Sequence, residues 1–346
     1  MSTLTEYLEQ FTEAEWLAAI DELLPSIHEV DRNAVQIWFR FYPLSFERYV
    51  AGAENRGETV QGLALKGDFD LKGQIDSSHH FLYGHRYWKT VRECVVRENT
   101  EFSPLRNTSL LETIKHVSIC TAEKKKEDRS LTNAIAAIGL MTLNQVGIEA
   151  FQAGSGEMKD PSGIMKKAPD AIVAERRKDD SQGLLGFLRT VDKKFSVAFS
   201  GLDSKGKFPI MLNEEIASAS QKDTKQDWQA ADQRCWQGPV PIECTSASCG
   251  TCWVGVLGGE EKLTPVKPRE LRQMKVFGYN QPEGEKPFIR LACQARAEGN
   301  VTIVIPPWNG VFGKKVYGNI DELELEPVTT SAKKLRELVK SANTDG

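Results

Sequence analysis

The chain has 346 residues, of which 44 are Lys or Arg and 48 are Asp or Glu, giving a formal net charge of −4. Such a balance lacks the basic excess that neutralises phosphates, and it argues against broad nucleic-acid binding. Hydrophobic residues make up 40% of the chain, enough for real cores, and the length predicts two domains of ~150 residues each.

The N-terminal segment, Met1 to Trp16, is acidic and polar, without the basic stretch and apolar run of a signal peptide. The most apolar stretch, Leu131 to Leu143, is shorter than the ~20 residues that a membrane span needs, and it predicts a buried helix. We therefore expect a cytoplasmic protein without a membrane span.

The first half of the chain has helical patterns. Thr12 and Glu15 form a capping box at a helix start, and Asp31 is the expected cap of a helix that stops before Pro43. Further helices are expected over 81–97 and 110–120, and an apolar helix is expected from a cap at residue 130 to about residue 151.

The composition changes over residues 153–182. Gly154-Ser155-Gly156 and the charged run over 175–180 are typical of loop and linker, so we place a domain boundary here. The Gly154-x-Gly156 pair is no nucleotide-binding fingerprint, because it lacks a preceding strand and the third glycine.

After the linker the apolar residues alternate with a period of two. Phe195, Val197 and Phe199 predict a half-buried strand, and Gly201 to Gly206 a hairpin turn. A strand over 208–212, a helix over 228–235, a strand over 253–257, a helix over 268–277 and a strand over 301–305 are expected to follow.

Four of the seven cysteines lie between residues 244 and 293. Cys244, Cys249 and Cys252 have the spacing C-x4-C-x2-C, and Cys293 follows in Arg-Leu-Ala-Cys-Gln. Two irons bridged by two sulfides need four thiolates, and this spacing is that of plant-type [2Fe–2S] proteins. The hydroxyls of Ser246, Ser248 and Thr251 are expected to approach the sulfurs, and Gly250 is expected to let the backbone turn. The alternative is a zinc site, which usually has two Cys-x-x-Cys-like knuckles where this chain has one.

On these motifs, with Trp228 to Asp232 before them, the stretch from about 190 to 306 resembles a 2Fe–2S ferredoxin. The resemblance implies a β-grasp fold with a mixed sheet and a helix across it. The long gap between Cys252 and Cys293 is more similar to the adrenodoxin layout. Ala247 stands where the family usually has glycine, which costs strain if that position needs a positive φ.

Together, these patterns and the resemblance predict an α+β protein: a mostly helical domain over residues 1–182 with the linker at its end, a β-grasp ferredoxin-like domain over 183–312 and a C-terminal extension over 313–346. We identify no family for the helical domain. Residues 332–339 have the pattern of an amphipathic helix.

Other chemically interesting residues have plainer interpretations. His79, His80 and His85 could ligate a metal, but their aromatic neighbours favour polar or capping roles. Cys94 and Cys120 are expected to be small buried residues, because an odd cysteine count without a signal peptide is not typical of a disulfide framework. Cys235 could replace a cluster ligand, but packing is the simpler role, and Trp308 is expected to cover the core.

The expected function is one-electron transfer through a [2Fe–2S] cluster held by Cys244, Cys249, Cys252 and Cys293. Residues 190–312 carry 15 basic and 14 acidic side chains, so long-range steering is weak and a dedicated redox partner protein is favoured. The alternative is an oxidoreductase or a redox-sensing subunit whose helical domain holds a further site. An oligomeric assembly stays open.

Overall fold

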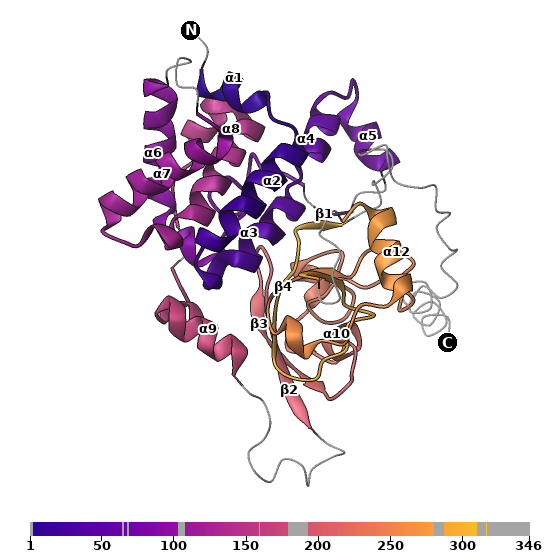
Figure 1. Cartoon of the computed structure of the whole chain (residues 1–346). Helices are drawn as coiled ribbons and strands as arrows, with labels where there is room; N and C mark the ends of the chain where they lie inside the picture. Colours follow the sequence, from indigo (N-terminus) through magenta and orange to yellow (C-terminus); the bar gives the residue numbers. More distant parts are fainter. Residues whose placement is uncertain are drawn as a thin grey trace. The chain divides into compact units, whose positions relative to one another are not determined.

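A computed structural model describes residues 3–63, 66–67, 69–102, 108–158, 160–178, 193–279, 287–309 and 316 (Figure 1). The chain divides into two compact units, one of residues 1–52 and 69–175, the other of residues 53–68 and 176–346. The expected boundary at 182/183 and the expected helix over 332–339 lie outside the described residues. The domain limits therefore stay a prediction.

The first unit is helical. Its α-helices are α1 (Leu4–Glu9), α2 (Glu13–Leu23), α3 (Glu29–Phe41), α4 (Leu44–Ala51), α6 (Trp88–Glu101), α7 (Leu110–Lys125) and α8 (Asn133–Ala153), and α9 (Pro169–Arg177) crosses the division. Short 3-10 turns are η1 (Leu24–Ser26), η2 (Tyr83–Tyr87), η3 (Arg129–Leu131) and η4 (Gly163–Lys166). The expected helix from residue 81 therefore begins later, because residues 83–87 form a 3-10 turn instead.

Two helices, α3 and α8, have other cap residues than the sequence predicts. The capping box of Thr12 and Glu15 is present at the start of α2. His28 caps α3, while the Asp31 carboxylate accepts the backbone N–H groups of Tyr83 and Gly84 at 2.7 and 2.8 Å. Asp31 is thus a buried tie between α3 and η2. At α8 the cap position is Thr132, not residue 130.

Helix α8 is the core of the helical unit, because it contacts α1, α3, α4, α6 and α7. It is kinked at Gly147, whose φ is 77°. Among the described helices it alone is long and apolar enough to cross a membrane, but 61% of its apolar window is buried inside the protein. Since the core helix of a soluble protein has the same properties, it is weak evidence for a span.

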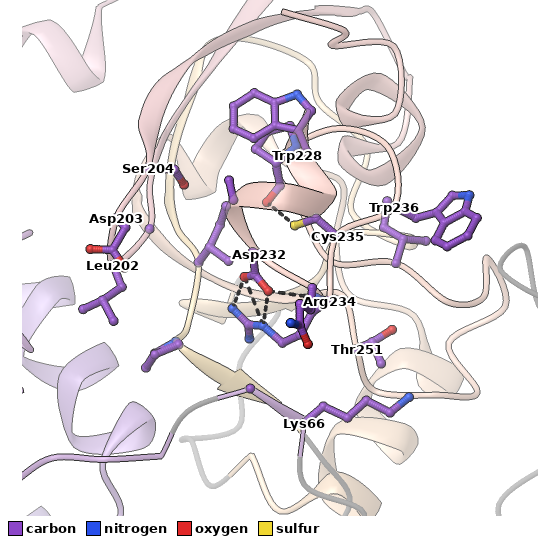
Figure 2. A pocket seen from close by; sticks show the side chains of 18 of the residues that line it. Lys66, Leu202, Asp203, Ser204, Trp228, Asp232, Arg234, Cys235, Trp236 and Thr251 are labelled. Carbon is purple, nitrogen blue, oxygen red and sulfur yellow. Dashed lines mark hydrogen bonds and ion pairs between the residues drawn. The ribbon is translucent and has the colours of Figure 1, made fainter. Parts of the chain in front are cut away.

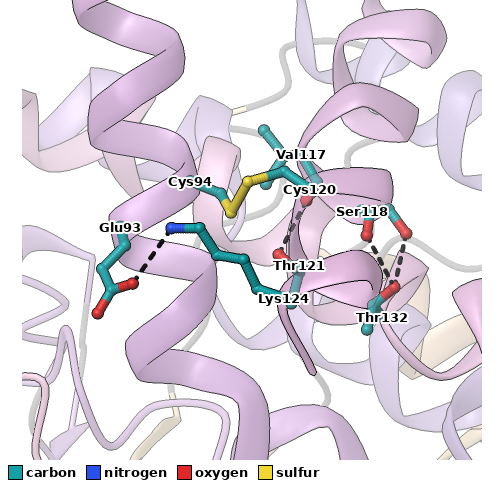
Figure 3. Close-up of a disulfide and its surroundings, with 8 residues drawn as sticks. All are labelled: Glu93, Cys94, Val117, Ser118, Cys120, Thr121, Lys124 and Thr132. Carbon is teal, nitrogen blue, oxygen red and sulfur yellow. Dashed lines mark hydrogen bonds and ion pairs between the residues drawn. A yellow bond between two sulfur atoms is a disulfide. The ribbon is translucent and has the colours of Figure 1, made fainter. Parts of the chain in front are cut away.

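Cys94 and Cys120 correct an expectation. Both are buried as predicted, at 1% and 7% exposed, but they are bonded to each other in a disulfide that joins α6 to α7. Figure 3 shows the bond beside the ion pair of Lys124 and Glu93, at 3.3 Å. Cysteine count alone did not reveal it, because a pair 26 residues apart has no diagnostic spacing.

The second unit is built on a sheet. Its elements are α5 (Arg56–Gly62), β1 (Lys66–Gly67), β2 (Lys194–Ser200), β3 (Lys205–Met211), α10 (Ile216–Ser220), α11 (Trp228–Ala231), β4 (Trp253–Gly258), η6 (Glu260–Lys262), α12 (Pro268–Phe277), β5 (Ile289–Leu291), β6 (Val301–Val304) and β7 (Trp308–Asn309). The main sheet has the order β3-β2-β6-β4-β5, and β1 pairs with β7 in a separate ribbon.

The sheet is mixed, as the ferredoxin resemblance implies. Strands β2 and β6 are parallel, with Val197 opposite Val301, and the other pairs are antiparallel. The alternation of buried and partly exposed residues along β2 matches its predicted period of two. Helix α10 contacts β3 and α12 contacts β5. The described chain is therefore α+β, with its helical region before the sheet.

Candidate metal centre

Three of the four candidate cysteines lie in the loop between α11 and β4, and the fourth lies two residues after β5. Cys244, Cys252 and Cys293 are 0–1% exposed, while Cys249 is partly exposed. Residues 252 and 293 are far apart in sequence, but the sheet brings them together because β5 pairs with β4, with Leu291 opposite Trp253. Cys293 lies two residues after the end of β5, and Cys252 directly precedes β4.

The four thiols influence one another's ionisation in two couples. The neighbouring Cys249 thiol lowers the pKa of Cys244 to about 5, and the Cys244 thiol raises the pKa of Cys249. In the same way the Cys252 thiol lowers the pKa of Cys293, and the Cys293 thiol raises the pKa of Cys252. The charge of Cys244 also acts on Cys293, and that of Cys249 on Cys252, so the pairs adjoin.

Two irons bridged by sulfides need two thiolates each, whereas a structural zinc gathers four ligands around one centre. Within the described residues, no group of three or more His, Cys, Asp or Glu side chains forms an arrangement that could hold a metal ion.

The loop backbone stabilises negative charge on the sulfurs. The N–H of Ser248 donates to Cys244 Sγ at 3.3 Å, and the backbone N–H of Ala247 donates to Cys293. Ser246 and Cys249 also direct their backbone N–H groups at Cys244. Hydrogen bonds to a thiolate favour its charged form, so the loop is suited to anionic ligands.

The hydroxyls only partly follow the prediction. Thr251 Oγ1 lies 2.9 Å from Cys249 Sγ, as expected. Ser246 and Ser248 instead bond each other, with 2.8 Å between their Oγ atoms. Gly250 has a φ of +67°, and an added Cβ would lie 3.0 Å from the Phe277 ring, so the turn needs glycine.

The other candidate residues have hydrogen-bond partners of their own. Cys235 Sγ donates to the Pro239 carbonyl at 3.3 Å, and burial raises its pKa to about 12, so it packs as expected. In the helical unit, the Nδ1 atoms of His79 and His85 are 2.9 Å apart and both rings are buried. His80 bonds the Ser77 carbonyl.

A cluster of aromatic rings packs next to the loop that holds Cys244, Cys249 and Cys252. Trp253 stacks on Tyr279 with 4.0 Å between ring centroids, and Trp308 meets Trp253 edge-on at 5.3 Å. The Tyr279 hydroxyl donates to the Gly250 carbonyl at 2.7 Å. Trp308 is fully buried, consistent with its expected place over the core.

Comparison with known families identifies the domain that contains this loop. Residues 217–298 match the family model of the 2Fe-2S iron-sulfur cluster binding domain. The C-terminal part of this chain contains a [2Fe–2S] cluster-binding domain. The match spans α10 to the segment before β6 and includes all four cysteines. No curated protein and no solved structure matches the chain.

Sequence reasoning missed three supports of the cluster-binding domain. A buried ion pair joins Glu270 of α12 to Arg290 of β5, at 2.8 Å between Glu270 Oε1 and Arg290 Nε. Lys66 of β1 forms an ion pair with Glu243, and Asn309 Nδ2 donates to the Thr251 carbonyl. Lys66 and Glu243 are 177 residues apart in sequence, and no local pattern signals such a contact.

A cavity of about 660 Å³ adjoins the ligand loop of the cluster-binding domain, and Glu243 and Thr251 line its wall. Figure 2 shows Arg234 and Asp232 joined by their ion pair, at 2.6 Å. Lys66 lines the same cavity from β1. The loop is therefore bordered by fixed charges.

Proposed function

We propose that this protein carries single electrons on a [2Fe–2S] cluster ligated by Cys244, Cys249, Cys252 and Cys293. The observation that carries the assignment is that the matched domain contains all four cysteines, and that the N–H of Ala292 donates to the Cys252 carbonyl at 2.9 Å, which brings Cys293 to the loop of the other three. When bound, the cluster supplies a one-electron couple. The chain's own residues supply thiolates, amide donors and a nearly dry environment.

We propose that electrons enter and leave beside Cys249. It is the most exposed of the four cysteines, and tunnelling from the cluster is shortest where the protein cover is thinnest. The domain has nearly equal numbers of basic and acidic side chains, so long-range electrostatic attraction of a partner is weak. We therefore favour docking on a dedicated redox partner protein through complementary shape. The N-terminal helical unit would position the domain on that partner.

Metal analysis tests the proposal. Anaerobically purified protein should contain two irons and two sulfides per chain, and dithionite should produce the EPR signal of a reduced [2Fe–2S] cluster. Bound zinc, or colourless protein with intact cysteines, would overturn the proposal. Iron above two per chain would point to the buried pair of His79 and His85 as a further site.

One observation favours a second candidate, a redox-sensing subunit. The helical unit holds the Cys94–Cys120 disulfide, and thiols of the cytoplasm, where we place this protein, are normally kept reduced. Alkylation and mass spectrometry of protein from quenched cells would show the state of this pair. A pair that switches with growth conditions would favour sensing, and a permanently oxidised pair would count against a cytoplasmic location.

A further inference from the structure

The cluster-binding unit includes a strand from the other half of the chain. Residues 53–68 group with the C-terminal unit, and β1 pairs antiparallel with β7, with Lys66 opposite Asn309 and Gly67 opposite Trp308. Gly67 has a φ of +84°, and an added Cβ would lie 2.4 Å from the Pro307 carbonyl oxygen. The pairing therefore requires glycine at this position.

This ribbon touches both sides of the ligand loop. From β1, Lys66 Nζ forms an ion pair with the carboxylate of Glu243, the residue before Cys244. From β7, Asn309 Nδ2 donates to the carbonyl of Thr251, the residue before Cys252. The two sides are also joined, because the N–H of Glu243 donates to Thr251 Oγ1 at 3.1 Å.

Lys66 and Glu243 are opposed charges beside the cluster ligands. Another close pair on the cavity wall, Arg234 with Asp232, is internally neutral, with 2.6 Å between Arg234 Nη2 and Asp232 Oδ2. Figure 2 shows Lys66 and Thr251 on the same cavity as this pair. A change at Lys66 alone leaves the Glu243 carboxylate without its cation, next in sequence to Cys244.

We propose that Lys66 is a positioning residue that raises the reduction potential of the cluster by neutralising and holding Glu243. The inference rests on the proposed function. Reduction adds one negative charge to the cluster, so an uncompensated carboxylate nearby disfavours the reduced state. The side chains are 45% and 24% exposed, so salt weakens the effect. The N-terminal half of the chain thereby tunes a centre whose ligands all lie in the C-terminal half.

The test is a charge cycle on the full-length, cluster-loaded protein at low ionic strength. K66M should lower the midpoint potential, E243Q should raise it, and the double variant K66M/E243Q should return close to wild type. At a fixed potential, each single change should alter the ratio of oxidised to reduced cluster roughly three- to tenfold. For a one-electron couple this corresponds to a shift of about 30–60 mV in the midpoint potential. K66R should keep the wild-type value. K115M, which removes a lysine paired with Glu112 at 2.8 Å in the helical unit, is the matched control.

A second variant tests the strand itself. G67A should displace β1 from β7, remove Lys66 from Glu243 and lower the potential as K66M does. G163A is its control, because Gly163 also has a positive φ of +56° but an added Cβ meets nothing within 4 Å.

The outcomes separate this inference from the proposed function. A merely structural role would lower cluster retention in both single variants without shifting their potentials in opposite directions. Unchanged potentials in K66M and E243Q with intact clusters would overturn the role of Lys66 alone. Wild-type protein without a reducible cluster would overturn the proposed function first.

Discussion

Ala247 has a backbone conformation that L-residues rarely adopt. Its φ is 62°, and its side chain is 1% exposed within the ligand loop. A left-handed conformation costs a non-glycine residue roughly 1–2 kcal/mol. The conformation has a use, because the Ala247 N–H donates to Cys293. The strain anticipated from the sequence is therefore present.

Replacing Ala247 with glycine should stabilise the loaded protein. The relief of ~1–2 kcal/mol is partly offset by the greater freedom of glycine in the unfolded chain, about 0.5–1 kcal/mol. We expect the free energy of unfolding to rise by up to about 1 kcal/mol, with unchanged iron content. Urea unfolding followed by cluster absorbance measures this change. Ala247→Val should lose stability, since β-branched residues tolerate a positive φ poorly. A247G with reduced stability would contradict the argument.

Cys249 and Cys235 offer a matched comparison of two cysteines in one domain. Cys249→Ala should abolish the visible absorbance and halve or remove the bound iron, because one iron loses a thiolate. Cys235→Ala should keep both, because its Sγ donates to the Pro239 carbonyl and Cys235 is not one of the four proposed ligands. Iron and sulfide assays on both variants provide the measurement. A colourless C235A with a coloured C249A would reassign the ligand set.

Three of the four ligand candidates stand out in the sequence because C-x4-C-x2-C is a local spacing, while the fourth, Cys293, lies far along the chain. Hydroxyl partners could not be predicted in the same way. Ser246 and Ser248 are close to the cysteines in sequence, yet their hydroxyls bond each other. A hydroxyl group can rotate toward any nearby acceptor, so its partner depends on the local geometry. Thr251 reaches Cys249 as expected.

At the scale of elements, a buried ion pair fastens the strand that leads to the fourth cysteine. Arg290 Nε and Nη2 donate to the two oxygens of Glu270 at 2.8 and 2.9 Å, and the N–H of Leu291 donates to the same carboxylate at 3.0 Å. The two side chains are 0–1% exposed. The pair thus ties α12 to β5 at Arg290, three residues before Cys293.

Breaking this pair on one side should destabilise the fold strongly. Arg290→Met leaves a buried carboxylate without its cation, which costs about 3–5 kcal/mol. The double variant E270M/R290M should lose less, because no charge is then left unpaired in the core. Urea unfolding gives both values, and K115M at an exposed pair should cost under ~1 kcal/mol. Equal losses in the single and double variants would refute the explanation.

Elements with strong local signals were predicted well, and those defined by distant partners were not. Helix α12, Pro268–Phe277, has its predicted bounds because Pro at its first turn and Gly278 after its end mark both termini. Strand β5 has three residues, too few for a periodic pattern, and was not predicted. Asp31 was misassigned as a cap because its partners, the N–H groups of η2, lie some fifty residues away.

At the scale of the molecule, two features escape the sequence because both depend on contacts between distant segments. One is the grouping of residues 53–68 with the cluster-binding unit. The other is the Cys94–Cys120 disulfide, whose partners meet only because α6 packs on α7. The change in pattern after the linker did predict the order of a helical part and a sheet part.

The two units should respond differently to acid. His79 in the helical unit is fully buried, with its ring centroid 4.0 Å from that of Trp88. Burial, and then the charges of His85 and His80, hold the pKa of His79 well below its usual range. Below pH ~6.5 the unfolded chain therefore binds a proton at this histidine that the folded chain does not bind.

Stability of the helical unit should thus be complete above pH ~6.5 and fall as the pH drops below it, by at most about 1.4 kcal/mol per unit for one proton. Urea unfolding followed by helical circular dichroism at pH 7.5, 6.5 and 5.5 measures the slope, while cluster absorbance follows the other unit separately. His79→Gln should flatten the slope of the helical signal and leave the cluster signal unchanged. His116→Gln, at an exposed position of α7, should leave both as in wild type. Equal slopes in wild type and H79Q would mean that other groups carry the acid sensitivity of the helical unit.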